Sequence, residues 1–283
     1  MKQSFFIALA ALFFATACEE ENHGVIFTRP LAPLLDTSYI DNAITGQTFK
    51  TIFLEDLTGV RCVNCPQAAQ KAKELKQKMG DTLVVVGLYL KSLPNFTNGY
   101  QGQEDLRTED AETIAQAIGV PQGLPNGYVD RHRFGASAGM PINDWEPSIN
   151  QRKGNTPIFL SLQKEIRSDS QVVIKSKIAY GENMGSANHK LAIYITESGI
   201  RSTQAFIGGY DEDYIHDHVL RGSVTPTMGI LLTQSLEKGR VFEKDYEYKW
   251  NPKWNRLKSY AVAIVIDANT EEVLQAKEIK LYD

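Results

Sequence analysis

The sequence predicts an α/β domain followed by an all-β antiparallel sandwich, behind an N-terminal export signal. Three observations predict this architecture. A short apolar run at the N-terminus ends at a cysteine. From about residue 49 to residue 154, strand-like and helix-like patterns alternate with short connections, which is typical of a parallel sheet covered by helices. From residue 155 to the C-terminus, apolar and charged residues alternate with a period of two, which is typical of half-buried strands.

Residues 1–17 resemble a bacterial lipoprotein signal peptide. Lys2 supplies a positive charge, and the apolar run from Phe5 to Ala17 is shorter than the roughly 20 residues that a membrane-spanning helix needs. Cys18 follows small residues, as in a lipobox, although Ala15 stands where Leu is usual. The resemblance implies that the Cys18 thiol is lipidated and attaches the protein to a membrane. The alternative is an ordinary secretory signal with an incidental cysteine.

Residues 18–48 are predicted to form a tether behind the lipid. Pro30 and Pro33 interrupt the segment, and neither a helical nor a strand period is sustained. The three glutamates directly after Cys18 resemble the surface-export signal of lipoproteins from the Bacteroidota. This resemblance implies the outer membrane and its cell-surface side, with the periplasmic face as the alternative.

The α/β domain is predicted over residues 49–154. Apolar residues at helical spacing precede Gly80, and a nearly unbroken apolar run follows it, which suits a strand buried on both faces. Thr108 caps the next predicted helix, and acidic residues occupy its first turn. The predicted strands are 51–58, 83–90 and 128–130, and the predicted helices are about 66–79, 109–118 and 143–152.

The antiparallel sandwich is predicted over residues 155–283. The turn-rich segment from Asp267 to Thr270 joins two strands into a hairpin. Its predicted strands include 172–180, 191–195, 242–250, 260–266 and 273–281.

Composition excludes some partners and suggests a redox state. The chain has 30 basic and 34 acidic side chains, so a nucleic-acid partner is not expected. Once Cys18 is lipidated, Cys62 and Cys65 are the remaining cysteines. Export takes them out of the reducing cytosol, so a disulfide between them can persist.

The C-x-x-C sequence is the strongest candidate for chemistry. Cys62 and Cys65 lie where a predicted strand turns into a helix, and the backbone N–H groups of a helix N-terminus favour a thiolate. Arg61 adds a positive charge beside them. Cys62, as the more exposed member of such a pair, would be the attacking nucleophile, and Cys65 would resolve the mixed disulfide.

This segment resembles thioredoxin. Asp56 stands six residues before Cys62, the position of a buried acid that assists proton transfer from the resolving cysteine, and Pro125 matches the place of a cis-proline that would lie against the disulfide. The sequence also departs from thioredoxin, because Arg61 replaces a tryptophan and the intervening pair is Val63-Asn64. The redox potential and the partner therefore cannot be carried over.

Three alternatives to redox chemistry stay open. The pair could be a structural staple, although so small a loop stabilises by only about 2 kcal/mol, against roughly 3 kcal/mol for a 15-residue loop. It could form half of a zinc site with His216 and His218. Those histidines could instead be ordinary surface residues, which is the default expectation. Asp56 could likewise be a solvated carboxylate at a strand end.

Two segments carry a further resemblance, Leu54–Pro66 and His216–Arg221. They resemble a family of Bacteroidota outer-membrane lipoproteins named for an outer-membrane protein of about twenty-eight kilodaltons. The resemblance implies a lipidated outer-membrane protein with a thioredoxin-like domain followed by an immunoglobulin-like β domain. Adhesion or receptor roles are proposed for such proteins.

Two functions follow as hypotheses. In the first, the protein exchanges disulfides with thiols of exported proteins and is a thiol–disulfide oxidoreductase. In the second, it is a surface adhesion or binding protein, the disulfide is structural, and the β domain recognises a surface ligand. Neither hypothesis requires a cofactor or a metal ion, and both leave the oligomeric state open.

Overall fold

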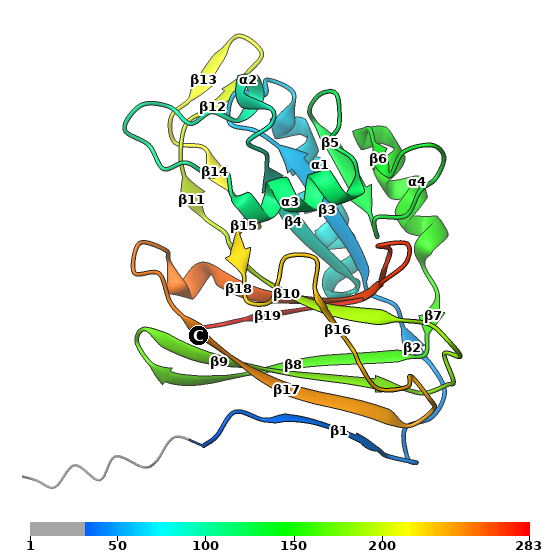
Figure 1. Ribbon diagram of the computed structural model, residues 1–283. Coiled ribbons are helices and arrows are strands. Elements are labelled where there is room, and N and C mark those ends of the chain that lie inside the picture. Colours follow the sequence, from blue (N-terminus) through cyan, green and yellow to red (C-terminus); the bar gives the residue numbers. More distant parts are fainter. Residues whose placement is uncertain (1–31) are drawn as a thin grey trace, which may run out of the picture. The chain divides into compact units, whose positions relative to one another are not determined.

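The computed structural model describes residues 32–283, so the predicted signal peptide and Cys18 lie outside the described residues. Residues 33–283 form one compact unit (Figure 1). Of the described residues, 41% lie in strands and 18% in helices. The strands are β1 (Asp36–Ile40), β2 (Thr48–Phe49), β3 (Ile52–Thr58), β4 (Leu83–Tyr89), β5 (Asn126–Val129), β6 (Gly139–Met140), β7 (Asn155–Thr156), β8 (Ile158–Ser168), β9 (Gln171–Tyr180), β10 (His189–Glu197), β11 (Ile200–Arg201), β12 (Gln204–Phe206), β13 (Gly209–Asp211), β14 (Ile215–His216), β15 (Val219–Ser223), β16 (Ile230–Leu231), β17 (Arg240–Lys249), β18 (Ser259–Asp267) and β19 (Val273–Lys280). The helices are α1 (Cys65–Met79), α2 (Pro94–Thr97), α3 (Glu109–Ile118) and α4 (Ile142–Arg152), with 3-10 turns η1 (Gly80–Thr82) and η2 (Arg256–Lys258).

One long mixed sheet runs through most of the unit. Its strands follow the order β19-β18-β10-β15-β4-β3-β5-β6, and β16 pairs with β10 at its side. Strand β4 is parallel to β3 on one side and to β15 on the other, whereas the remaining neighbours in this sheet are antiparallel. The join between β15 and β4 is short, since only Val219 and Gly87 are paired there.

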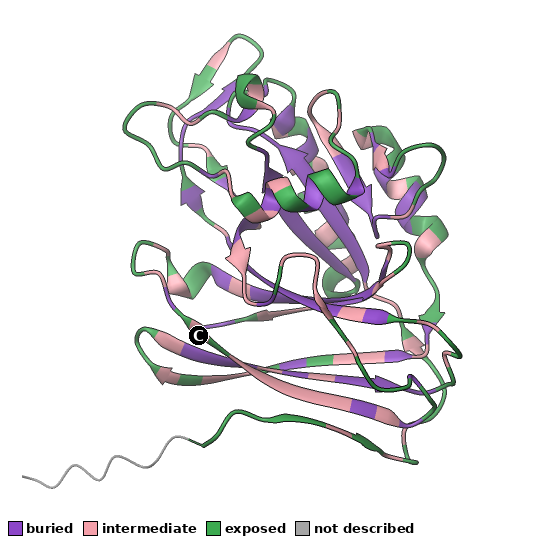
Figure 2. Ribbon diagram, in the orientation of Figure 1, coloured by how far each residue is buried: buried purple, intermediate pink, exposed green. Residues whose placement is uncertain are grey.

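A second sheet of four strands, in the order β1-β17-β9-β8, forms another layer. It packs against the β10, β18 and β19 part of the long sheet, and the apolar core between them includes Ile174, Tyr180, Ile193 and Val265. Figure 1 shows the two sheets as adjacent layers. Strand β1 lies at the outer edge and is largely exposed (Figure 2), although it falls inside the segment 18–48 predicted as a tether.

Helices cover both faces of the β3–β4 region. Ile52 and Leu54 of β3 face α1 and α4, in a core that includes Leu75 and Trp145. Phe53 lies between them in sequence and points to the opposite face, where α3 packs. Both strands are buried along their whole length (Figure 2), as the unbroken apolar run over residues 83–90 predicts.

The predicted fold class is wrong, although most of its elements are confirmed. The strands at 51–58 and 83–90, the three helices and the C-terminal hairpin all form near the expected bounds, and Thr108 caps α3 by accepting a hydrogen bond from the N–H of Ala111. The assembly differs. Strand β5 is antiparallel to β3, and the long sheet joins β3–β6 to β10, β15, β18 and β19.

A thioredoxin-like α/β domain and a separate immunoglobulin-like sandwich are therefore not found, and the described chain is mostly β with several sheets. The physical reason is that β4 still has a free edge after pairing with β3, and β15 occupies that edge. The division of the chain near residue 154 stays a prediction, which a truncation experiment can test.

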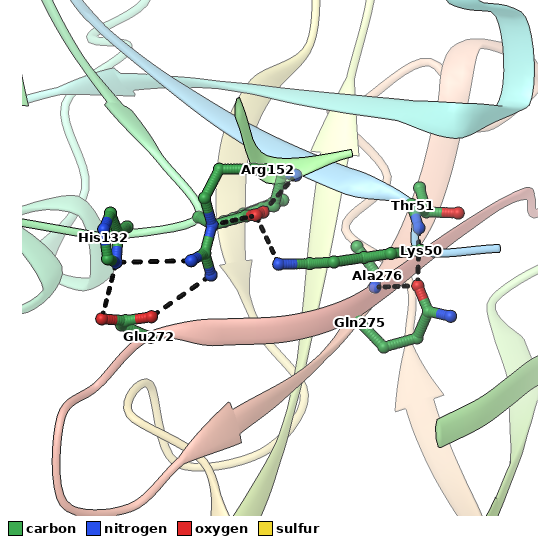
Figure 3. A network of polar contacts seen from close by, with 9 residues as sticks. Lys50, Thr51, His132, Arg152, Glu272, Gln275 and Ala276 are labelled. Atoms are coloured by element: carbon green, nitrogen blue, oxygen red, sulfur yellow. Dashed lines mark hydrogen bonds and ion pairs between the residues drawn. The ribbon is translucent and has the colours of Figure 1, made fainter. Parts of the chain in front are cut away.

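A polar network connects segments that lie far apart in the sequence (Figure 3). Asp130 accepts hydrogen bonds from Lys50 (2.6 Å), from Arg152 (3.1 Å) and from the backbone N–H of Phe53 (2.9 Å). Arg152 also reaches Glu272 in the β18–β19 turn at 3.2 Å. Burial lowers the pKa of Lys50, which the neighbouring Asp130 partly offsets. The network thus links the segment before β3, the helix α4 and the C-terminal hairpin.

Candidate functional site

Cys62 and Cys65 form a disulfide at the junction of β3 and α1. The two Cα atoms are 5.3 Å apart. Strand β3 ends at Thr58, and Cys65 is the first residue of α1. The backbone N–H of Cys65 donates to the carbonyl of Cys62 at 3.1 Å, which tightens the turn. The predicted position between a strand and a helix N-terminus is therefore found.

The disulfide is buried, which the sequence did not predict. Cys62 is 2% exposed and Cys65 1%, so Cys62 is hardly more accessible than its partner. The covering segment is β12. The N–H of Ala205 donates to the carbonyl of Val60 at 2.8 Å, and the side-chain amide of Gln204 lies 3.0 Å from the carbonyl of Cys62.

The side chain of Arg61 contacts the segment that follows α2. Its guanidinium donates to the carbonyls of Asn98 and Gly99 and lies over the ring of Tyr100, 4.3 Å from its centroid. Tyr100 in turn makes an edge contact with Tyr210 of β13. Arg61 therefore joins the disulfide turn to the 96–100 loop and, through Tyr100, to the β12–β13 hairpin.

Asp56 is a buried acid close to the disulfide. The residue is 6% exposed, and its Oδ1 atom has no hydrogen-bond partner. Because burial disfavours the charged form, the pKa of Asp56 is raised to about 7. The solvated alternative for this carboxylate is therefore wrong.

Pro125 follows a cis peptide bond with Leu124. The next residue, Asn126, pairs with Leu57 in β3, so Pro125 lies at the end of the sheet from which the Cys62 turn departs. Pro125 is half-buried. The register brings Pro125 and the disulfide to one end of the sheet.

A cavity of about 760 Å³ lies beside the disulfide. Asp56, Cys65 and Gly87 line it on the side of α1, β3 and β4. The other side is lined by Ser198, Gly199, Gln204 and residues 214–218, together with Lys258 and Tyr260. Cys65 belongs to the lining, whereas Cys62 does not.

The two histidines are not ordinary surface residues. His216 is buried, its Nδ1 lies 2.8 Å from the hydroxyl of Tyr89, and burial lowers its pKa to about 4. His218 has a left-handed backbone with φ of 58°, so the two rings do not share a strand face. Within residues 32–283, no cluster of His, Cys, Asp and Glu suits a metal ion.

Sequence reasoning missed Gln204, which contacts the carbonyl of Cys62, and Tyr89, which lines the cavity, because no motif or period in the sequence marks either residue. His216, which the zinc alternative had placed with the cysteine pair, lines the cavity as well. Chemically, the arrangement offers a disulfide, a buried acid of raised pKa and a covering strand that would have to move before a protein substrate could reach Cys62.

Comparison with known proteins assigns a family rather than a reaction. The family described as outer membrane protein Omp28 matches residues 111–282. No curated protein matches the chain significantly. In the part of the chain that the structure describes, no helix is long and apolar enough to span a bilayer.

Among solved structures, the chain is similar to HBP35 of Porphyromonas gingivalis, with a TM-score of 0.63 and 17% identity over 84% of this chain and 77% of that one. This likeness shows the fold alone. A protein of Agrobacterium tumefaciens has a TM-score of 0.49, with 11% identity over 84% of this chain and 97% of that one. A domain of the outer membrane lipoprotein Omp28 from Porphyromonas gingivalis has a TM-score of 0.33, with 18% identity over 45% of this chain and 89% of that domain.

Proposed function

The chain belongs to the family of outer membrane protein Omp28 and is an outer-membrane protein, and from this premise we propose that it exchanges disulfides with exported proteins through Cys62 and Cys65. The chemistry is that of a thiol–disulfide oxidoreductase. We further propose that a lipid on Cys18 holds it to the membrane with the described unit on the cell-surface side.

The unpartnered Oδ1 atom of Asp56 is the observation that carries this proposal. A buried carboxyl oxygen without a hydrogen bond costs stability, and groups with strongly perturbed pKa values gather at functional sites. A purely structural disulfide has no need of a neighbouring proton acceptor. With a pKa of about 7, Asp56 can both take up and release a proton near neutral pH.

The exchange starts from the reduced pair. The Cys62 thiolate attacks one sulfur of a substrate disulfide, a mixed disulfide forms, and one substrate thiolate leaves. Cys65 then gives its proton to Asp56 and attacks the Cys62 sulfur. This closes the Cys62–Cys65 bond and releases the second substrate thiolate. Because β12 covers Cys62 in the oxidised state, substrate access requires the contacts of Gln204 and Ala205 to open.

Insulin reduction tests this function. The purified chain from residue 33 onward, supplied with dithiothreitol, should accelerate precipitation of the insulin B chain, and Cys62→Ser should abolish the acceleration. Asp56→Asn should slow it by about tenfold, in the lower part of the range that a positioned proton acceptor contributes. Asp81→Asn, which alters an exposed carboxylate, is the matched control. Wild-type activity no greater than that of Cys62→Ser would overturn the proposal.

A second candidate, surface binding, is favoured by the tip of the β12–β13 hairpin. Phe206, Ile207 and Tyr210 are 40%, 72% and 66% exposed, so three large side chains meet solvent on one short hairpin. Exposed clusters of this kind often mark interaction sites.

Immobilised extracellular-matrix proteins offer a direct test of binding. The double substitution Ile207→Ser and Tyr210→Ser should remove retention of the chain, and Ile166→Ser, an equally apolar exposed position on β8, should leave it unchanged. Equal retention of both variants would exclude the hairpin as the binding surface.

A further inference from the structure

The cavity beside the disulfide is lined by the cysteine that does not attack the substrate in the exchange mechanism. Cys65, Asp56 and Gln204 of β12 line the cavity, whereas Cys62 does not. Because Cys65 is 1% exposed, a ligand in the cavity reaches its sulfur only when the lining opens. The size of the cavity limits the molecules that it admits. A volume of about 760 Å³ falls within the roughly 300–1,000 Å³ of small-molecule pockets and is far too small for a folded protein.

Two lysines of the cavity favour an anionic ligand, and two carboxylates, Asp56 and Asp217, oppose them. Lys73 and Lys258 belong to its lining, are exposed, and make no ion pair among the described residues. The Oδ1 atom of Asp217 accepts a hydrogen bond from the N–H of Gly199. His216 and His218 have pKa values lowered by burial and are neutral at pH 7. Two unpaired ammonium groups therefore face solvent at this cavity.

Asp56 supplies a second, independent indication of a ligand. It is more than nine-tenths buried, lines the cavity, and has one oxygen without any partner. An unsatisfied buried acceptor next to a cavity calls for an explanation, and a proton taken up by this carboxyl from a bound molecule supplies one.

We propose that this cavity admits a low-molecular-weight thiol bearing a carboxylate, and that this thiol is the reductant that restores the Cys62–Cys65 dithiol. The inference rests on the proposed exchange function, for which it supplies the missing electron donor. Lys73 and Lys258 attract the carboxylate, and the thiol approaches Cys65.

The reduction balances with two thiol molecules. The first thiol gives its proton to Asp56, and its thiolate attacks the Cys65 sulfur. The Cys62–Cys65 bond breaks, and its electron pair leaves on Cys62, where the helix N-terminus stabilises a thiolate and so makes it a good leaving group. A second thiol attacks the mixed disulfide on the small-molecule sulfur and releases the small disulfide. Cys65 recovers the proton from Asp56, and the proton of the second thiol goes to Cys62.

Two thiols of opposite charge test this route. The oxidised chain is incubated with 3-mercaptopropionate or with cysteamine at equal thiolate concentration, free cysteines are trapped by alkylation, and the rate of reduction is read by mass spectrometry. We expect wild type to react at least tenfold faster with 3-mercaptopropionate. The double variant Lys73→Glu and Lys258→Glu should reverse this preference, whereas Lys238→Glu, an exposed lysine outside the cavity, should keep it.

Failure of the inference can be told apart from failure of the proposed function. If the ratio of the two rates is the same in wild type and in the double variant, the cavity route is excluded, whatever insulin activity remains. If the ratio reverses as expected but insulin is not reduced, the route survives and the protein substrate is wrong. A second double variant, Lys73→Gln with Lys258→Gln, removes both charges without reversing them. It should bring the ratio of the two rates near one, and a ratio equal to that of wild type would also overturn the inference.

Discussion

At the scale of single residues, the carboxyl group of Asp56 lies in a buried environment that destabilises its charged form. Its neighbours in β4 and β5 are buried, and neither supplies a hydrogen bond to Oδ1. The neighbouring acid Glu55 is also fully buried, but its charge is paired. Arg131 is buried beside it, and its Nε lies 2.9 Å from a carboxylate oxygen of Glu55. Adjacent acids in one strand therefore have opposite environments.

Asp56 should make the protein less stable as the pH rises. The unfolded carboxyl ionises near 3.8 and the folded one near 7, so between these pH values the unfolded chain binds fewer protons. The free energy of unfolding should therefore fall as pH rises from about 4 to 7, and the loss persists above 7. Relative to wild type, Asp56→Asn should have a higher free energy of unfolding at pH 8. This gain should exceed the gain at pH 4 by on the order of 2 to 4 kcal/mol.

Urea denaturation at the two pH values measures this difference. Asp81→Asn serves as the control, since it removes an exposed carboxylate and should change the free energy of unfolding little at either pH. A gain for Asp56→Asn that is equal at pH 4 and pH 8 would contradict the assigned burial of this acid.

At the scale of elements, the β12–β13 hairpin closes over the disulfide turn. Gln204 lies within hydrogen-bond distance of the carbonyls of Gly59, Cys62 and Ala205. Gln103 holds the same segment from the other side through Ser202 and the N–H of Thr203. These contacts are made by side chains and single backbone groups, not by a continuous ladder of strand hydrogen bonds. Only a few hydrogen bonds therefore have to break for the hairpin to open.

Gln204→Ala should speed reduction of the disulfide. Removing the amide takes away the contacts of Gln204 with these carbonyls, although Gly59 and Cys62 keep their backbone donors, and it weakens the closed form by roughly 1 kcal/mol. If opening of the hairpin limits access, the rate of reduction by dithiothreitol should rise about tenfold. Gln116→Ala removes the same amide from the exposed side of α3 and should leave the rate unchanged. An unchanged rate for Gln204→Ala would mean that β12 does not limit access.

At the scale of the whole molecule, the long sheet and its core join the two halves of the chain. One apolar cluster contains Phe53, Val84 and Tyr128 together with Tyr194 and Val262. Arg131, paired with Glu55, also lies 3.2 Å from the hydroxyl of Tyr194. The core on one face of β3 and β4 is therefore completed by residues from beyond the predicted boundary at 154.

Cutting the chain at this boundary should expose that shared core. We expect the chain from residue 33 onward to unfold in urea in one cooperative transition, and residues 155–283 alone to lose cooperativity and bind a hydrophobic dye. Circular dichroism and dye fluorescence measure the two properties. A fragment that unfolds with a transition as sharp as that of the longer chain would instead support the predicted division into two domains.

The sequence by itself determined the local elements and the position of the Cys62–Cys65 pair. The apolar run at 83–90, the helical spacing before Gly80 and the cap at Thr108 each depend on neighbours within a few residues, so they could be interpreted one segment at a time. Cys62 and Cys65 are three residues apart, and their placement at a helix start follows from the same local pattern.

Only the tertiary structure decided the sheet order, the burial of the disulfide and the cavity. Val219 joins β4 from more than a hundred residues away, and Gln204 reaches Cys62 across a similar separation. Pairing of this kind depends on which strand edge remains free and which segment can reach it. The alternation of residues along a strand shows which residues lie on each of its faces, but it does not show which strand pairs with each of its edges. The order of the strands could therefore not be predicted from periodicity.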